Sequence, residues 1–170
     1  LIIADDGADP DTVAMDLLSQ AEHDPCASAI LVTPCEGLAR AVMEKAEDLA
    51  QALPRREVLK TSLGEHSLCV VTKDLDEAFA VANTVAPEHL ELMMANAFDH
   101  LGKVRNAGAI FLGYHTPEAI GDYIAGPNHT LPTGSTARFS SPLGVHDFIK
   151  RSSILYAPER AIRELGTLAV

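Results

Sequence analysis

Two hydrophobic patterns alternate along the first two thirds of the chain. Short continuous apolar runs are typical of strands buried on both faces, and apolar residues spaced three or four apart are typical of amphipathic helices. The pattern predicts strands over residues 1–4, 27–33, 67–72, 89–93 and 109–112. It predicts helices from residue 10 up to Pro25, from residue 34 to about 53, from residue 75 through 82, and over residues 97–104.

This order of elements predicts an α/β fold. We expect a doubly wound, mostly parallel sheet with helices on both faces, an incomplete Rossmann-like unit over residues 1–113. After Gly113, glycines and prolines interrupt residues 121–144, and so long a loop is usually functional or disordered. Its Tyr, Ile, Leu and Phe residues favour an ordered loop. Residues 145–156 fit either a strand or a helix, and a final helix is expected from Pro158 and still running at Val170.

Helix starts are marked by capping residues. The predicted N-caps are Asp9, Thr33 and Asp74, each followed by a proline, an acidic residue or both near the helix start. These signals place the first turns of three helices on the sequence.

Composition limits the class of function. The net charge of −11 over 170 residues argues against a surface for nucleic acid or anionic membrane. Three widely spaced cysteines without metal-finger spacing indicate reduced thiols, and no apolar run is long enough for a membrane helix. We therefore expect a cytoplasmic protein that acts on a small molecule. Because the chain opens on an apolar strand without an initiator Met, we also expect it to be a piece of a longer protein.

Polar residues gather on one flank of the first helix. Asp16, Gln20 and His23 fall together at 100° per residue, and Gln20 and His23 could offer an amide oxygen and an imidazole nitrogen to a metal. The alternative is that both side chains cap carbonyl groups or meet water at the helix end, and these two residues alone favour it. Asp122, at the mouth of the Gly/Pro-rich loop, is the best third donor, although an aspartate there also suits a turn. One amide, one imidazole and one carboxylate would suit zinc or manganese.

Two further candidates carry imidazoles. Glu88 and His89 place an acid beside a histidine between a helix and a strand, which suits proton transfer near neutral pH. The alternative is a solvated glutamate and a partly buried histidine, because strand neighbours point to opposite faces. His129 lies between two prolines in the loop and could be aimed at a ligand or be incidental. The chain contains no GxGxxG, P-loop or GxSxG motif, so neither a dinucleotide fingerprint nor a serine nucleophile is indicated.

Taken together, six stretches resemble the L-histidinol dehydrogenase family over essentially all 170 residues. They are LLSQAEHDP, ILVTP, APEHLEL, NAGAIFLG, GDYIAGPNHTLPTGSTARFSSPLG and FIKRSS. Members of this family are zinc enzymes of histidine biosynthesis that oxidise L-histidinol through L-histidinaldehyde to L-histidine with two NAD. The resemblance implies that Gln20, His23 and Asp122 bind zinc, that Glu88 and His89 are the acid–base residues, and that His129 contacts substrate. The metal ligands and His89 would contact the substrate as well.

The chain also departs from the family pattern. The family's fourth zinc ligand is a histidine from the partner subunit of a homodimer, in a C-terminal segment that this chain lacks, and its NAD site belongs to a missing N-terminal region. The resemblance therefore implies a fragment with the zinc and catalytic half, with residues 114–170 as an active-site loop and C-terminal extension of the same domain. We expect the isolated chain to be inactive. A paralogous zinc/NAD dehydrogenase for another polar alcohol and a non-catalytic metal-binding module remain as alternatives.

Overall fold

The computed structural model of the chain describes residues 1–169. Its centre is a five-stranded, entirely parallel sheet in the order β3-β2-β1-β4-β5. The strands are β1 (Ile2–Ala4), β2 (Ile30–Thr33), β3 (Leu68–Val71), β4 (His89–Met93) and β5 (Ala109–Leu112). In the central strand, Ile2 lies opposite Leu31 of β2 and Glu91 of β4. All five predicted strands are confirmed.

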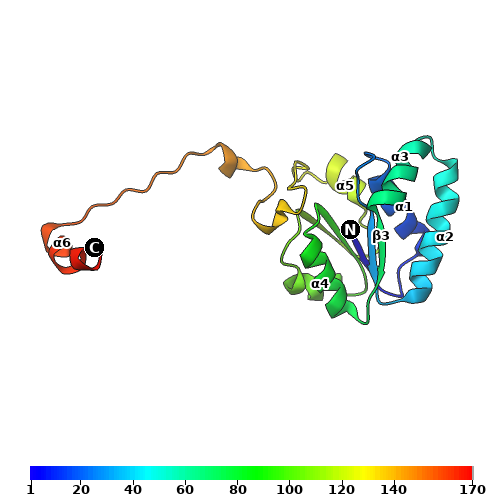
Figure 1. Cartoon of the computed structure of the whole chain (residues 1–170), viewed down its shortest axis with the longest axis horizontal. Coiled ribbons are helices and arrows are strands. Elements are labelled where there is room, and N and C mark those ends of the chain that lie inside the picture. Colours follow the sequence, from blue (N-terminus) through cyan, green and yellow to red (C-terminus); the bar gives the residue numbers. More distant parts are fainter. Residues whose placement is uncertain (170) are drawn as a thin grey trace.

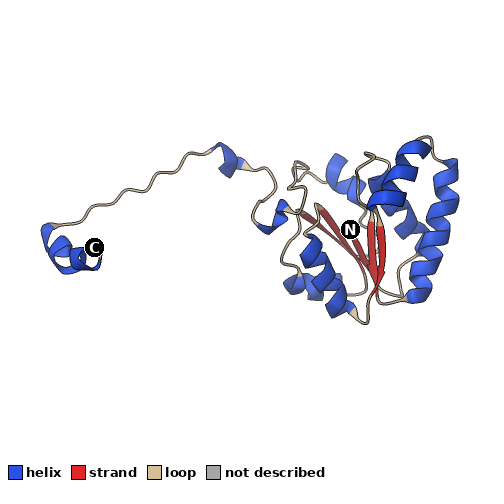
Figure 2. Ribbon diagram, in the orientation of Figure 1, coloured by secondary structure: helices blue, strands red, loops and turns tan. Residues whose placement is uncertain are grey.

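Helices cover both faces of the sheet, as Figures 1 and 2 show. On one face, α1 (Pro10–Ala21), α2 (Glu36–Ala52) and α3 (Arg56–Thr61) pack on a core that includes Ile2, Leu31 and Met93. On the other face, α4 (Leu75–Val85) and the 3₁₀ helix η2 (Ala97–Lys103) pack on Ile3, Val32 and Leu92. The expected doubly wound α/β fold is confirmed, because alternate strand residues feed two separate cores.

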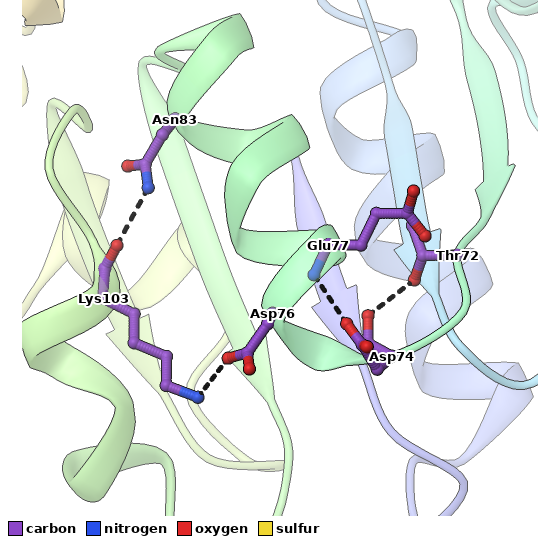
Figure 3. Close-up of polar contacts among 6 residues, drawn as sticks. All are labelled: Thr72, Asp74, Asp76, Glu77, Asn83 and Lys103. Carbon is purple, nitrogen blue, oxygen red and sulfur yellow. Dashed lines mark hydrogen bonds and ion pairs between the residues drawn. The ribbon is translucent and has the colours of Figure 1, made fainter.

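Two of the three predicted helix caps are confirmed. The carboxylate of Asp9 accepts a hydrogen bond from Thr12 N, and that of Asp74 accepts one from Glu77 N at 2.8 Å (Figure 3). The prediction of Thr33 as the cap of α2 is wrong. Cys35 is the N-cap there, with its sulfur 3.4 Å from Leu38 N, and Thr33 Oγ1 instead accepts from Cys35 N. The helix starts two residues late because Thr33 still belongs to β2.

The same view shows how α4 is held to the segment after β4. Lys103 Nζ lies 2.6 Å from Asp76 Oδ1, and Asn83 Nδ2 donates to the carbonyl oxygen of Lys103 at 2.9 Å (Figure 3). Thr72 Oγ1 donates to the carbonyl oxygen of Asp74 at the start of the helix. These contacts fix both the first turn of α4 and its later part.

Several boundaries differ from the sequence prediction. The first helix ends at Ala21 and not at Pro25, so His23 lies in the turn that follows. Residues 56–66, for which no element was predicted, form α3 and the π-helical turn η1 (Ser62–His66), because their single buried leucine, Leu59, gives little periodic signal.

The chain beyond β5 is mostly irregular. It contains α5 (Glu118–Tyr123) and the 3₁₀ helices η3 (Thr136–Arg138) and η4 (Val145–Phe148), then an extended stretch leading to α6 (Glu159–Leu165) and η5 (Gly166–Leu168). Figure 1 shows this stretch carrying α6 away from the sheet. Residues 145–156 therefore form neither the expected strand nor a long helix. The final helix ends at Leu165, short of the predicted end, and Val170 lies outside the described residues. Within residues 1–169, no helix combines the length and the apolarity that crossing a bilayer requires.

Candidate active site

A cavity of about 360 Å³ opens at the edge of the sheet where the strands begin. Residues at the starts of three neighbouring strands, Leu1, Ile30 and His89, line it together with Gln20 and Glu88. Parallel strands begin at one edge, and the helix that follows a strand returns to that same edge. This connectivity brings the last turn of α1, with Gln20, to the first residue of β4. From the loop after α5, Thr133, Gly134 and Ser135 complete the lining, and Ser135 Oγ donates to the carbonyl oxygen of Val85 at 2.7 Å.

The backbone before β4 turns sharply. Ala86 ends α4 in the left-handed region with a φ of 52°, and Pro87 follows it. Glu88 therefore precedes the strand and His89 is its first residue, so both side chains line the same cavity. Neighbouring side chains point to opposite faces only within the strand, which begins at His89, so this rule does not separate Glu88 from His89.

His89 is the most confined group of the site. Only 7% of the residue is exposed, and neither ring nitrogen makes a hydrogen bond. Nδ1 lies 3.6 Å from Glu118 Oε1, and Nε2 lies 3.5 Å from Asp122 Oδ1. Glu118 and Asp122 are four residues apart on α5 and therefore share one face of the helix. Ligand-type atoms of these three side chains all lie within 4.8 Å of one another, so the geometry collects donors of the kind that metals bind.

A glycine allows α5 to come this close. A Cβ atom on Gly121 would lie 2.5 Å from Phe111 Cε1 of β5, far inside van der Waals contact. The Phe111 ring in turn lies 6.0 Å from the His89 ring, centroid to centroid. The absence of a side chain at Gly121 therefore sets the approach of Glu118 and Asp122 to His89.

Burial shifts the ionisation of these groups. It lowers the pKa of His89, against the opposing effect of the Asp122 carboxylate, so the neutral ring is favoured. Burial, reinforced by the charge of Asp122, raises the pKa of Glu88, and the same two causes raise the pKa of Glu118 to about 7. A carboxyl group with a pKa of about 7, such as that of Glu118, suits proton transfer.

Comparison with known proteins gives the chain its family. The sequence profile of histidinol dehydrogenase matches residues 1–170. The chain belongs to the histidinol dehydrogenase family. It is 50% identical over 165 residues to the histidinol dehydrogenase of Sulfurimonas denitrificans and 55% identical over 165 residues to that of Wolinella succinogenes. Each alignment covers 97% of this chain and 38% of the relative.

A solved structure agrees with the sequence relatives. The crystal structure of histidinol dehydrogenase from Elizabethkingia anophelis superposes with a TM-score of 0.86 at 36% identity, over 98% of this chain and 38% of that one. The chain thus spans about two fifths of the length of the histidinol dehydrogenases that it matches. The prediction of this family from sequence stretches is confirmed.

The structure brings some of the residues predicted for a histidinol dehydrogenase site together. Asp122 contacts His89, and Gln20 shares the cavity with Glu88 and His89. His23 is exposed in the turn after α1, near enough to Glu88 and His89 to affect the pKa of each. His129 lies with Asp122 along a second cavity of about 310 Å³. The roles assigned to these residues stay predictions.

Sequence reasoning missed two groups of this site. Glu118 and Glu91 both approach the face of β4 that carries His89, and neither was predicted as a site residue. Glu91 had a sequence signal, because a carboxylate two residues after His89 in a continuous buried strand must face the same side. Glu118 had none, because its place depends on how α5 packs.

Proposed function

We propose that the full-length protein carrying this chain oxidises L-histidinol through L-histidinaldehyde to L-histidine, using zinc and two NAD. The observation that carries the proposal is His89, a buried imidazole with two free ring nitrogens at the wall of a polar cavity. Family membership supports the choice of substrate. We further propose a cytoplasmic homodimer in which the partner subunit supplies another zinc ligand, and an NAD site outside this chain.

Gln20, His23 and Asp122 are the residues proposed to hold the zinc. An amide oxygen, an imidazole nitrogen and a carboxylate oxygen form a mixed donor set that zinc accepts, and it leaves a coordination position for substrate. When bound, the zinc would fix the amino alcohol through its amine and imidazole nitrogens and so hold the carbinol carbon in place. His89 is assigned to proton transfer rather than to the metal, because its ring already lies between two carboxyl groups.

In this proposal, the neutral His89 accepts the hydroxyl proton as hydride leaves the carbinol carbon. Burial favours that neutral state, and two carboxyl groups with raised pKa values, Glu88 and Glu118, lie at the same site. Glu88 then takes a proton from the water that attacks the aldehyde, which prepares the second oxidation. His129, which lines a second cavity together with Asp122, is proposed to contact the substrate.

The variant Glu88→Gln in the full-length protein tests whether Glu88 acts in the second oxidation while His89 acts in the first. The amide cannot accept a proton, so oxidation of histidinaldehyde should fall by about 10²- to 10⁴-fold, while oxidation of histidinol is spared. Single-turnover NADH formation from each substrate measures the two steps separately. Glu47→Gln, at an exposed position of α2, is the matched control. Intact aldehyde oxidation in Glu88→Gln would show that the role given to Glu88 is wrong.

A further inference from the structure

The middle of β4 carries a carboxyl group where the core would accept a hydrocarbon. Glu91 is 4% exposed and lies on the face of the strand that also carries His89. The adjacent residues Leu90 and Leu92 join the core on the opposite face. Burying an ionised carboxylate is costly unless a partner compensates it, so this glutamate requires an explanation.

The groups around Glu91 are mostly of its own charge. Asp16 faces it from α1 and Glu118 from α5, and His89 precedes it on β4. On the β1 side, the backbone nitrogen of Leu1 donates to the carbonyl oxygen of His89 at 2.9 Å. Among residues 1–169, every Lys or Arg that forms an ion pair pairs with another carboxylate. No basic side chain therefore neutralises this group.

The Asp16 and Glu91 carboxyl groups lie within hydrogen-bonding reach of each other. One oxygen of each, Asp16 Oδ2 and Glu91 Oε2, is buried and accepts no hydrogen bond from a backbone, hydroxyl or nitrogen donor. Two carboxylates cannot hydrogen-bond to each other, because both only accept, but a carboxylic acid can donate to a carboxylate. Glu91 is 4% exposed whereas Asp16 is only half-buried, so the proton belongs on Glu91, the more deeply buried group. Burial and then the charge of Asp16 accordingly raise the pKa of Glu91 to about 8.

We propose that Glu91, as the protonated donor to Asp16, is a positioning residue that ties the helix carrying Gln20 to the strand carrying His89. Asp16 lies four residues before Gln20 on α1, and Glu91 lies two residues after His89. The Asp16–Glu91 hydrogen bond therefore joins α1 to β4 about one helical turn from Gln20 and two strand residues from His89. Because neither carboxyl group lines the cavity, the pair acts through Gln20 and His89. The inference rests on the proposed function of that site.

Two replacements of Glu91 in the full-length protein separate positioning from simple packing. Glu91→Gln keeps a donor to Asp16, so kcat for histidinol should stay within about threefold of wild type. Glu91→Met keeps the bulk but removes the donor, so kcat should fall by about 10- to 100-fold, the usual loss for a group that orients a catalytic or metal-binding residue. KM should change less, because the substrate still binds but meets a misplaced base.

A matched control and a spectroscopic readout complete the test. Thr33 is a fully buried residue at the carboxyl end of β2, away from the cavity, and Thr33→Val removes its hydrogen bond with Cys35 N. This variant should therefore lower Tm and leave kcat unchanged. The infrared difference spectrum between wild type and Glu91→Gln should contain the C=O stretch of a buried protonated carboxyl group, which only wild type has at this position.

The outcomes distinguish this inference from the proposed function. Wild-type kcat in Glu91→Met, equal losses in both variants, or no protonated-carboxyl band in the difference spectrum would each overturn the positioning pair. If wild type does not oxidise histidinol, the proposed function fails, while the infrared band still decides whether Glu91 holds the proton. If Glu91→Met does not fold, Asp16→Ala, which removes the acceptor, takes its place in the comparison with Glu91→Gln.

Discussion

Polar groups at the two ends of the parallel strands differ in whether they are hydrogen-bonded. At the carboxyl edge, between β1 and β4, the Asp5 carboxylate accepts hydrogen bonds from Gly7 N, Ala95 N and Tyr114 OH at 2.8–3.0 Å. At the amino edge, His89 is buried and neither of its ring nitrogens makes a hydrogen bond. Satisfied groups hold a structure together, whereas unsatisfied ones call for a further explanation such as catalysis.

This contrast runs against the usual rule for open α/β sheets, in which ligands bind at the carboxyl edge where the strand order reverses. Here Tyr114 lies at that edge, and its hydroxyl packs so tightly on Gly7 that a Cβ there would lie 2.6 Å away. The cavity with Glu88 and His89 lies instead at the amino edge, where the ends of α1 and α4 meet the loop after α5. The fold alone therefore does not locate the site.

The largest expected effect is at the amino edge. His89→Asn removes the proposed base, so kcat for histidinol oxidation in the full-length protein should fall by about 10²- to 10⁴-fold. The measurement is steady-state NADH formation at saturating histidinol. Retention of wild-type kcat would break the assignment of the amino edge as the reactive one.

The next effect is on the pH dependence of stability. Burial raises the pKa of Glu91 from 4.5 to about 8, so the folded state binds this proton more tightly than the unfolded chain does. The stabilisation is fully present below pH 4.5 and is lost as pH rises to about 8. Tm measured across that range should fall less steeply in Glu91→Gln than in wild type. Parallel curves for the two proteins would show that Glu91 is not protonated in the fold.

A third test concerns the spacing of α5. Gly121→Ala must push the helix away from Phe111, which should lower stability by about 1–3 kcal/mol and lower kcat about tenfold by moving Glu118 and Asp122. Gly102→Ala is the matched control, because nothing lies within 4 Å of a Cβ there. Denaturant unfolding and kcat are compared for the two variants. Equal results for both would mean that the contact with Phe111 does not set the site.

The smallest kinetic effect is expected at the carboxyl edge. Tyr114→Phe removes the hydroxyl donor to the Asp5 carboxylate, so the free energy of unfolding should fall by about 1.5–3 kcal/mol. Because no atom of this network lines the cavity, kcat should stay within about threefold of wild type. A large loss of kcat at unchanged stability would extend the reactive region to this edge.

The fold was predictable where local signals are strong. Continuous apolar runs located all five strands, and the caps Asp9 and Asp74 located two helix starts. The Cys35 cap was missed because Thr33, a more typical capping residue, lies just before it, but Thr33 belongs to the end of β2. The helical turns over residues 56–66 were missed because these residues lack a repeating apolar pattern.

The candidate site was predictable only in part. The sequence marked Glu88, His89 and Asp122 as polar groups at element boundaries, and the structure places all three around one ring or cavity. It could not show that Glu118 and Glu91 join them, because these contacts form between α5, β4 and α1, which lie far apart along the chain. Long-range packing, not local propensity, creates the buried carboxyl groups.

The two hydrophobic cores draw no member from beyond Tyr114, although the chain continues for another 55 described residues. Ile154, Leu155 and Tyr156 are each more than 85% exposed on the extended stretch that Figure 1 shows leaving the body. Substitutions there change no packed interior in residues 1–114. That stretch can therefore accumulate changes without altering how the α/β body folds.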